Sequence, residues 1–385
     1  MTSTRLAIAV PLLLWSNGLA RAADPAPQHT PGEVRTAIAR GVAFLVNSQN
    51  SDGSWGGASD AITTWSGWTW SNPESHRAWR VATTGLACTA LLDVGNSRET
   101  AAAVDRGLDY LTANALVKRP SEVDTMSCWA FIYGLQALAT AYGDSRYADS
   151  PQRDAFRQAA QTHLRQLAYH QSLTGGWGYL EFDRPRTARP QWATSFTTAA
   201  GVVALIDARD AGLDVDPVML RRAVKAVRRC WLPNGAYTYS VRAIPHPRKI
   251  GSINRVKGST CRIQTCNLAL LMGGDEISAT RLQTGLDQLF EHHRFIDIAL
   301  HKPIPHETYY QNSGYFYLFG HYYAARVIEQ IPPDARPMYW PKLQHELIKI
   351  QQKDGSMWDY DHHAYDKPYG TAFALMALGR SLGLE

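Results

Sequence analysis

A short turn with a central glycine recurs along the chain, and its spacing constrains the fold more than any other feature. Four copies of this turn occupy residues 49–55 (QNSDGSW), 171–177 (QSLTGGW), 231–237 (WLPNGAY) and 351–358 (QQKDGSMW). Their glycines are separated by one or two lengths of about 60 residues, which is the signature of a repeat protein. The sequence therefore predicts six copies of one unit, in which the turn is eroded near Asn114 and near Arg294.

Each unit is predicted to hold an amphipathic helix followed by a helix that is apolar on nearly every side. The predicted pairs are 31–48 with 81–93, 102–114 with 126–142, 154–170 with 194–208, 217–230 with 261–272, 278–293 with 313–330, and 341–352 with 371–382. A helix that is apolar all round must be buried. Closing the row into two concentric rings buries the apolar helices inside, so the predicted fold class is all-α, an (α/α)6 toroid.

The first 22 residues have the pattern of a secretory signal peptide. Arg5 precedes the apolar run 6–15, and Ala20 to Ala22 supply a small-residue cleavage site. Residues 23–29 are predicted to be a flexible lead-in, and one toroid domain fills 30–385. No later stretch is apolar enough to cross a membrane, so we expect an exported protein, periplasmic or extracellular, with an uncleaved anchor as the alternative.

Charge and cysteine content say less about function. Without Arg5 and Arg21, 37 basic residues (39 − 2) face 34 acidic ones, and this net charge of +3 argues neither for nor against a nucleic-acid partner, so none is predicted. The five cysteines are an odd number, and a Cys230–Cys261 disulfide and buried free thiols are the alternatives. No cofactor is predicted, and dependence on a divalent metal is left open.

The turn of units one and three has the form Q-x3-G-x-W, with degenerate copies in units four and six. It resembles the repeat of terpenoid cyclases and protein prenyltransferases, over most of the chain that follows the signal peptide. The resemblance implies the toroid, and it implies that four side chains join each outer helix to the next element: Gln49, Trp55, Gln171 and Trp177. It also implies an isoprenoid-type ligand, bound or transformed in the mouth of the barrel.

Two departures from that family stand out. Squalene-hopene-type cyclases use the acid of a D-x-D-D run, and prenyltransferase β subunits bind zinc through a D-x-C pair and a histidine, and neither set occurs in this sequence. The amino ends of the buried helices should crown one mouth of the barrel. Asp124 lies at such an end and is predicted to be a catalytic acid or the N-cap of its helix. The other candidate ligand-binding residues at these ends are Trp192, Arg262, Tyr309, Asn312 and Tyr369.

Three loops suggest further chemistry. In unit five, His306 is a candidate base beside Tyr310, an arrangement that suits β-elimination from a uronic acid. In unit six, Asp359, Asp361 and His362 are candidate metal ligands or a solvated loop. The tryptophan-rich loop of unit one predicts a lid, a stacking platform or a membrane-dipping patch, and its residues are Trp65, Trp68, Trp70 and Trp79, of which Trp68 and Trp70 are candidate ligand contacts.

Basic residues also gather in the loops of units three and four, which favours an anionic carbohydrate or a pyrophosphate as ligand. Three classes of function therefore stay open. The chain is a terpenoid-cyclase-like protein, a polysaccharide-degrading enzyme of the lyase type, or a non-catalytic envelope protein that binds a partner. The sequence does not decide whether the chain is an enzyme.

Overall fold

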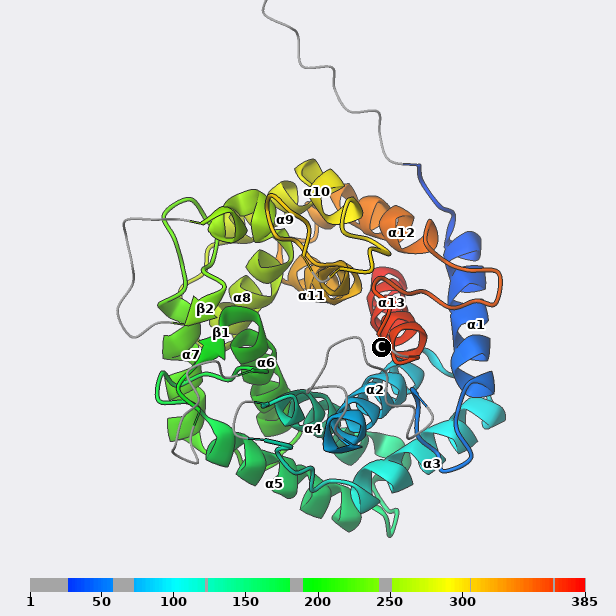
Figure 1. Ribbon diagram of the computed structural model, residues 1–385. Helices are drawn as coiled ribbons and strands as arrows, with labels where there is room; N and C mark the ends of the chain where they lie inside the picture. Colours follow the sequence, from blue (N-terminus) through cyan, green and yellow to red (C-terminus); the bar gives the residue numbers. More distant parts are fainter. Residues whose placement is uncertain are drawn as a thin grey trace, which may run out of the picture.

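The computed structural model describes residues 27–57, 73–121, 124–180, 190–241, 251–304, 306–362 and 364–384. Over these residues the regular secondary structure is almost entirely helical and forms two concentric rings, which confirms the predicted (α/α)6 toroid (Figure 1). None of the helices in the described part of the chain is long and apolar enough to cross a membrane. The predicted signal peptide, Trp65, Trp68 and Trp70 lie outside the described residues.

The two rings alternate along the chain. The outer helices are α1 (Pro31–Asn47), α3 (Arg98–Ala113), α5 (Arg153–His170), α7 (Pro217–Arg228), α9 (Ala279–Glu291) and α12 (Trp340–Ile348). The inner helices are α2 (Pro73–Val94), α4 (Ser127–Gly143), α6 (Ser195–Asp210), α8 (Thr260–Met272), α11 (Tyr317–Gln330) and α13 (Asp366–Leu382). Each inner helix packs against the next, and α13 packs against α2, so the ring is closed.

The remaining elements are short. They are α10 (Arg294–Asp297), the strands β1 (Ala193–Thr194) and β2 (Ser240–Val241), and the 3-10 helices Ser145–Tyr147, Ser252–Asn254, Val256–Gly258, Gly314–Phe316 and Arg336–Met338. The two strands pair antiparallel, with Ala193 opposite Val241, and they join the loops that precede α6 and α8.

In three of the four turns a glutamine, Gln49, Gln171 or Gln351, binds the next outer helix. The Gln49 amide nitrogen donates to the carbonyl of Gly53 at 2.9 Å and to that of Ala103 in α3 at 2.8 Å. In the last unit the Gln351 amide nitrogen donates to the carbonyl of Ala37 in α1 at 2.9 Å, across the whole length of the chain. The same side-chain contact that links neighbouring units therefore also closes the ring between the last unit and the first.

The tryptophan of the turn ties the outer helix to the inner one. The Trp55 indole nitrogen donates to the carbonyl of Leu45 at 2.7 Å, and its backbone nitrogen donates to the hydroxyl of Thr84 in α2 at 3.0 Å. Trp177 repeats both contacts, with the carbonyl of Leu167 and the hydroxyl of Thr198 in α6. These hydrogen bonds confirm that the glutamine and tryptophan of the turn are fold residues.

In unit six the structure corrects the alignment of the turn. Met357, and not Trp358, takes the tryptophan position, because its backbone nitrogen donates to the Thr371 hydroxyl at 2.9 Å and its side chain is fully buried. The ring of Trp358 instead lies 3.9 Å from that of His301. The spacing of Q-x3-G-x-W thus holds in the four copies of the turn, with methionine in place of tryptophan here.

Two other sequence predictions are corrected. Helix α2 begins at Pro73 and not near Val81, so Trp79 belongs to the helix and not to the loop before it. Proline in the first turn and Glu74 beside it are signals for a helix start, which the apolar run further on obscured. All five cysteines are free and buried, so the predicted alternative of a Cys230–Cys261 disulfide is wrong.

The turn glycines have a backbone conformation that other residues rarely adopt. Gly355 has a φ of +90°, and a Cβ there would lie 2.4 Å from the carbonyl oxygen of Arg40 in α1. Gly274 has a similar φ of +89° but open space around it. We expect Gly274→Ala to lower the free energy of unfolding by about 1–2 kcal/mol through the left-handed backbone alone. Gly355→Ala should cost about 3 kcal/mol or more because it also pushes the ring apart.

Urea-induced unfolding of the two variants beside the unchanged chain measures both effects. Equal losses at the two positions would show that the turn of unit six does not need its close approach to α1 to hold the ring together.

Candidate functional site

Aromatic side chains fill the axis of the inner ring from its first helical turns. Trp129 of α4 and Phe319 of α11 come from opposite sides of the ring (Figure 1), and their rings meet edge to face with centroids 6.5 Å apart. Deeper in the ring, the Gln136 amide donates to the Tyr322 hydroxyl across the same axis at 2.7 Å. At these levels the axis is occupied by packed side chains. Candidate chemistry is therefore confined to the rim, meaning the amino ends of the inner helices with the loops that precede them.

His306 has the most informative surroundings in the rim. Its Nδ1 lies 2.8 Å from the carbonyl oxygen of Gln311 and 2.7 Å from the Ser313 hydroxyl. A carbonyl only accepts, so Nδ1 carries the hydrogen and Nε2 keeps a lone pair. That Nε2 lies 3.5 Å from the hydroxyl of Tyr315. Gln311 has a left-handed φ of 59°, which is uncommon for its type and directs its carbonyl at the ring of His306.

Three tyrosines from three different units surround this histidine. The hydroxyls of Tyr179 and Tyr239 are hydrogen bonded to each other, and the ring of Tyr239 lies 6.3 Å from that of His306. The hydroxyls of Tyr239 and Tyr179 also influence the pKa of Tyr315, which places the three phenols in one neighbourhood. We call Tyr179, Tyr239, His306 and Tyr315 the rim cluster. All four side chains are partly exposed, so solvent reaches the cluster.

The rim cluster holds its protons in a defined way. Burial raises the pKa of all three tyrosines, so the phenols stay protonated at neutral pH. Burial lowers the pKa of His306, and the charge of Arg262 lowers it further, against a raising effect from the Gln311 carbonyl. The cluster therefore combines a neutral imidazole that can accept a proton with phenols that can donate one, the two halves of acid–base catalysis.

Two predicted ligand-binding residues adjoin the rim cluster. Arg262, in the first turn of α8, is 1% exposed and places its guanidinium 5.4 Å from the ring of Tyr239. Trp192 stands 5.5 Å from the ring of Tyr179 and donates from its indole nitrogen to the Ser240 hydroxyl at 3.1 Å. The structure thus brings together three of the residues predicted from the sequence, His306, Arg262 and Trp192.

Other unit-five candidates lie elsewhere. Tyr310 packs edge-on against Phe295 at 4.9 Å, and Tyr309 beside it is 61% exposed. The phenol next to His306 is Tyr315, so the predicted pairing of His306 with Tyr310 is replaced by a pairing with Tyr315. The Asn312 amide donates to the backbone carbonyl of Lys257, in the 3-10 helix Val256–Gly258, and to that of Phe295 in α10. It is 4% exposed, which makes it a support of the rim.

Asp124 lies on the mouth side of the inner ring, between the amino ends of α2 and α4. Its Oδ2 accepts a hydrogen bond from the Ser75 hydroxyl and its Oδ1 accepts one from the backbone nitrogen of Met126, both at 2.9 Å. Met126 is the N-cap residue of α4, so Asp124 precedes the cap position that the sequence suggested. Burial raises the pKa of Asp124, but both oxygens already hold the loop to the helices.

The predicted metal ligands of unit six point in different directions. Asp359 is fully buried and accepts hydrogen bonds from the Tyr369 hydroxyl at 2.9 Å and the Leu318 backbone nitrogen at 3.0 Å, and burial raises its pKa to about 7. Asp361 is exposed, and the ring of His362 meets Trp79 edge-on at 4.4 Å. Tyr369 thus supports a buried carboxyl group.

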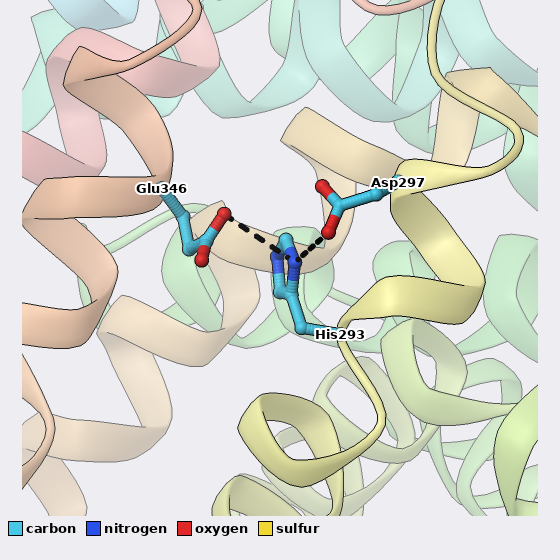
Figure 2. Close-up of side chains that lie close together, drawn as sticks. All are labelled: His293, Asp297 and Glu346. Atoms are coloured by element: carbon cyan, nitrogen blue, oxygen red, sulfur yellow. Dashed lines mark hydrogen bonds and ion pairs between the residues drawn. The ribbon is translucent and has the colours of Figure 1, made fainter. Parts of the chain in front are cut away.

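Among the described residues, one group has the spacing of a metal site, His293, Asp297 and Glu346 (Figure 2). His293 Nδ1 lies 3.1 Å from Asp297 and 3.3 Å from Glu346. The ammonium of Lys349 forms ion pairs with both carboxylates, so a positive charge already occupies the place of a cation. The group joins α10 to α12 in the outer ring, and we assign it to the stability of the fold.

Together these features define an α/α toroid with a polar, tyrosine-rich rim. No protein-family model matches the chain, and no curated protein matches it. Among solved structures, the GH76A α-1,6-mannanase of Salegentibacter sp. HEL1_6 is similar at 11% identity and a TM-score of 0.55, over 91% of this chain and 100% of the mannanase.

Two further structures share the architecture. A possible GH105 member from Klebsiella pneumoniae has 14% identity and a TM-score of 0.55 over 98% of this chain and 99% of its own. The type II terpene cyclase MstE from Scytonema has 14% identity and a TM-score of 0.52 over 92% of this chain and 100% of its own. At these identities the likeness shows the fold, which carbohydrate-acting enzymes and a terpene cyclase share.

Two of the three tyrosines that the sequence analysis missed do leave a signal. Tyr179 and Tyr239 both stand four residues after the glycine of a turn, and Asp359 stands at the same position in unit six. This position follows the turn, where the chain leaves the outer helix and runs toward the start of the inner helix. The structure therefore places it in the rim. Tyr315 has no such marker.

Proposed function

We propose that the chain is a polysaccharide-degrading enzyme of the lyase type that works at the rim. The observation that carries the proposal is the rim cluster, in which the neutral His306 faces the protonated Tyr315. In a lyase reaction the base removes a proton from carbon, the neighbouring carbon–oxygen bond breaks, and an acid protonates the oxygen that leaves. The proposal includes export, which rests on the signal-peptide pattern of residues 1–22.

Hydrolysis fits the rim less well. Glycoside hydrolases use a pair of carboxylic groups with free oxygens on either side of the bond that is cut. Asp124 and Asp359 are the buried carboxyl groups described in the rim, and both oxygens of each accept hydrogen bonds from the protein.

An isoprenoid ligand remains the second candidate. The aromatic side chains of the inner ring and the shared architecture with a terpene cyclase favour it. Such a ligand needs a deep and dry cavity, whereas Trp129 and Phe319 already meet across the axis in the first turns of the inner helices.

The test uses the purified chain without its predicted signal peptide, residues 23–385. It is incubated with polygalacturonate, alginate and hyaluronan, with the neutral polymers mannan and xylan, and with polyprenyl pyrophosphates. We expect one acidic polymer to yield unsaturated sugar ends, seen as new ultraviolet absorbance together with new reducing ends. Reducing ends without unsaturation would show hydrolysis, and conversion of a polyprenyl compound alone would support the isoprenoid candidate. Either result overturns the lyase proposal.

A further inference from the structure

We infer that Arg262 is a binding site for the carboxylate of an acidic sugar, so that the substrate is a polymer of uronic acid. The inference rests on the proposed function and adds to it the chemical class of the substrate and the residue that recognises it. It is carried by a buried cation without a counter-charge, next to the rim cluster.

The surroundings of Arg262 leave its charge uncompensated. One terminal nitrogen donates to the backbone carbonyl of Ile253 and, at 3.4 Å, to that of Tyr237. The Nε hydrogen has no partner in the described part of the chain, although the side chain is 1% exposed. No described aspartate or glutamate forms an ion pair with it. Backbone carbonyls hold the guanidinium in place, but no carboxylate of the described residues forms an ion pair with it.

A buried guanidinium without an ion-pair partner, such as that of Arg262, is energetically unfavourable. Moving a charged side chain into a protein interior carries a desolvation penalty that persists after relaxation. The rings of Tyr239 and Phe316, with the guanidinium 5.4 and 6.0 Å from their centroids, offset part of that penalty through cation–π attraction. The remaining cost is offset when an anion binds, and a guanidinium is suited to a carboxylate because its N–H groups match the two oxygens.

The position of Arg262 explains why a carboxylate is required for chemistry as well as for binding. In a uronic acid the carboxylate is bonded to the carbon that carries the proton to be removed. Binding that carboxylate to a cation stabilises the negative charge that develops when the C–H bond breaks and its electron pair moves toward the carboxyl group. The pair then forms the new carbon–carbon double bond, the bond to the leaving oxygen breaks, and that oxygen takes a proton from a phenol.

The components lie close enough to act on one sugar unit. The guanidinium stands over the ring of Tyr239, whose ring centroid is 6.3 Å from that of His306. The charge of Arg262 also acts on His306, Tyr179 and Tyr315. A sugar whose carboxylate reached Arg262 would therefore place its ring against the phenols and its C–H bond near Nε2 of His306.

The experiment measures binding and not turnover. Isothermal titration of the chain uses oligomers of galacturonate, of alginate and of hyaluronan, each beside its carboxyl-reduced counterpart, and a sulfated neutral galactan oligomer. We expect at least one uronate oligomer to bind about 10- to 100-fold more tightly than its reduced form, the range of a charge-assisted pair. Arg262→Met should remove this preference and leave the affinity for the reduced oligomer unchanged, and Arg262→Gln provides a second variant.

Arg157→Met is the matched control, because it removes one positive charge from an exposed ion pair on α5, outside the rim. It should keep the preference. Thermal unfolding of Arg262→Met tests the alternative that Arg262 only stabilises the fold. Loss of an uncompensated buried charge should leave the melting temperature unchanged or raise it, whereas loss of a stabilising arginine should lower it. A preference that survives Arg262→Met, or tight binding of the sulfated oligomer alone, would overturn the inference. Preferential binding without cleavage would instead remove the proposed lyase function and keep the carboxylate site.

Discussion

Replacing His306 with glutamine is expected to lower kcat/KM on the polymer that the chain cleaves by about 100- to 10,000-fold, the range contributed by a general base. Glutamine keeps a donor toward the Gln311 carbonyl but has no lone pair with the basicity of Nε2. Tyr315→Phe should lower kcat/KM by a similar factor, because it removes the phenol that faces Nε2. Initial rates of ultraviolet absorbance with the active polymer measure both effects.

The pH dependence distinguishes a base from a structural residue. The pKa of His306 is lowered mainly by burial, so its neutral form persists to a lower pH than that of a free histidine. The value of kcat/KM should therefore rise with pH, and the midpoint of this limb should lie below about pH 6.5, the value for a free histidine. His306→Gln should lose this limb along with its activity, and thermal melting should show that the variant still folds.

His301→Gln is the control in the same loop. His301 is exposed, packs on Trp358 and takes no part in the rim cluster. It should keep the activity and the pH profile of the unchanged chain. If His306→Gln retains more than about one tenth of kcat/KM, or keeps the limb, His306 is not the base.

The fold could be predicted because its information is local and repeated. The turn glycine needs a left-handed φ, and the glutamine and tryptophan around it make the same hydrogen bonds in units one and three. The spacing of the turns in the sequence therefore equals the spacing of the helix pairs. The residues at which helices begin were harder to predict from the sequence. In α2, residues 73–80 form a helix without an apolar stripe, because two of the three buried positions there are polar, Ser75 and His76.

The candidate site could be predicted only in part, because it is assembled from units that are far apart in the chain. His306, Arg262 and Trp192 were found one by one as residues at the amino ends of inner helices. Nothing in the sequence states that Tyr179 and Tyr239, separated by 60 residues, share a hydrogen bond. That contact follows from the curvature of the ring, which points the turns of adjacent units at a common rim. Asn312 was predicted from the sequence as a ligand-binding residue, but its amide donates to backbone carbonyls of the fold instead.

Buried histidines should make the fold sensitive to mild acid. His163 of α5 is fully buried beside Phe131, and neither of its ring nitrogens has a hydrogen-bond partner among the described residues. Burial lowers the pKa of His163 to about 3. It lowers that of His170, two turns further along α5, to about 4. Both therefore stay neutral in the folded chain under conditions where an unfolded chain takes up a proton.

The free energy of unfolding depends on pH because the folded and unfolded chains bind different numbers of protons at these histidines. The folded pKa lies below the unfolded value of about 6.5, so the stabilisation is complete above pH 6.5 and is lost as pH falls toward the folded pKa. A pH of about 5 lies about 1.5 units below the unfolded pKa, which corresponds to a loss of about 2 kcal/mol for each histidine. We expect the free energy of unfolding, measured with urea, to be lower at about pH 5 than at about pH 7.5 by about 4 kcal/mol from this pair.

His163→Leu tests the assignment. Leucine fills a similar volume without an unpaired polar atom, so the variant should be as stable as the unchanged chain at about pH 7.5 and should lose about 2 kcal/mol less on acidification. His301→Gln, which removes an exposed imidazole, should lose as much as the unchanged chain. Equal losses in all three proteins would mean that His163 takes up its proton inside the fold at little cost. The packing of α5 against α4 would then have to open to water before the toroid itself unfolds.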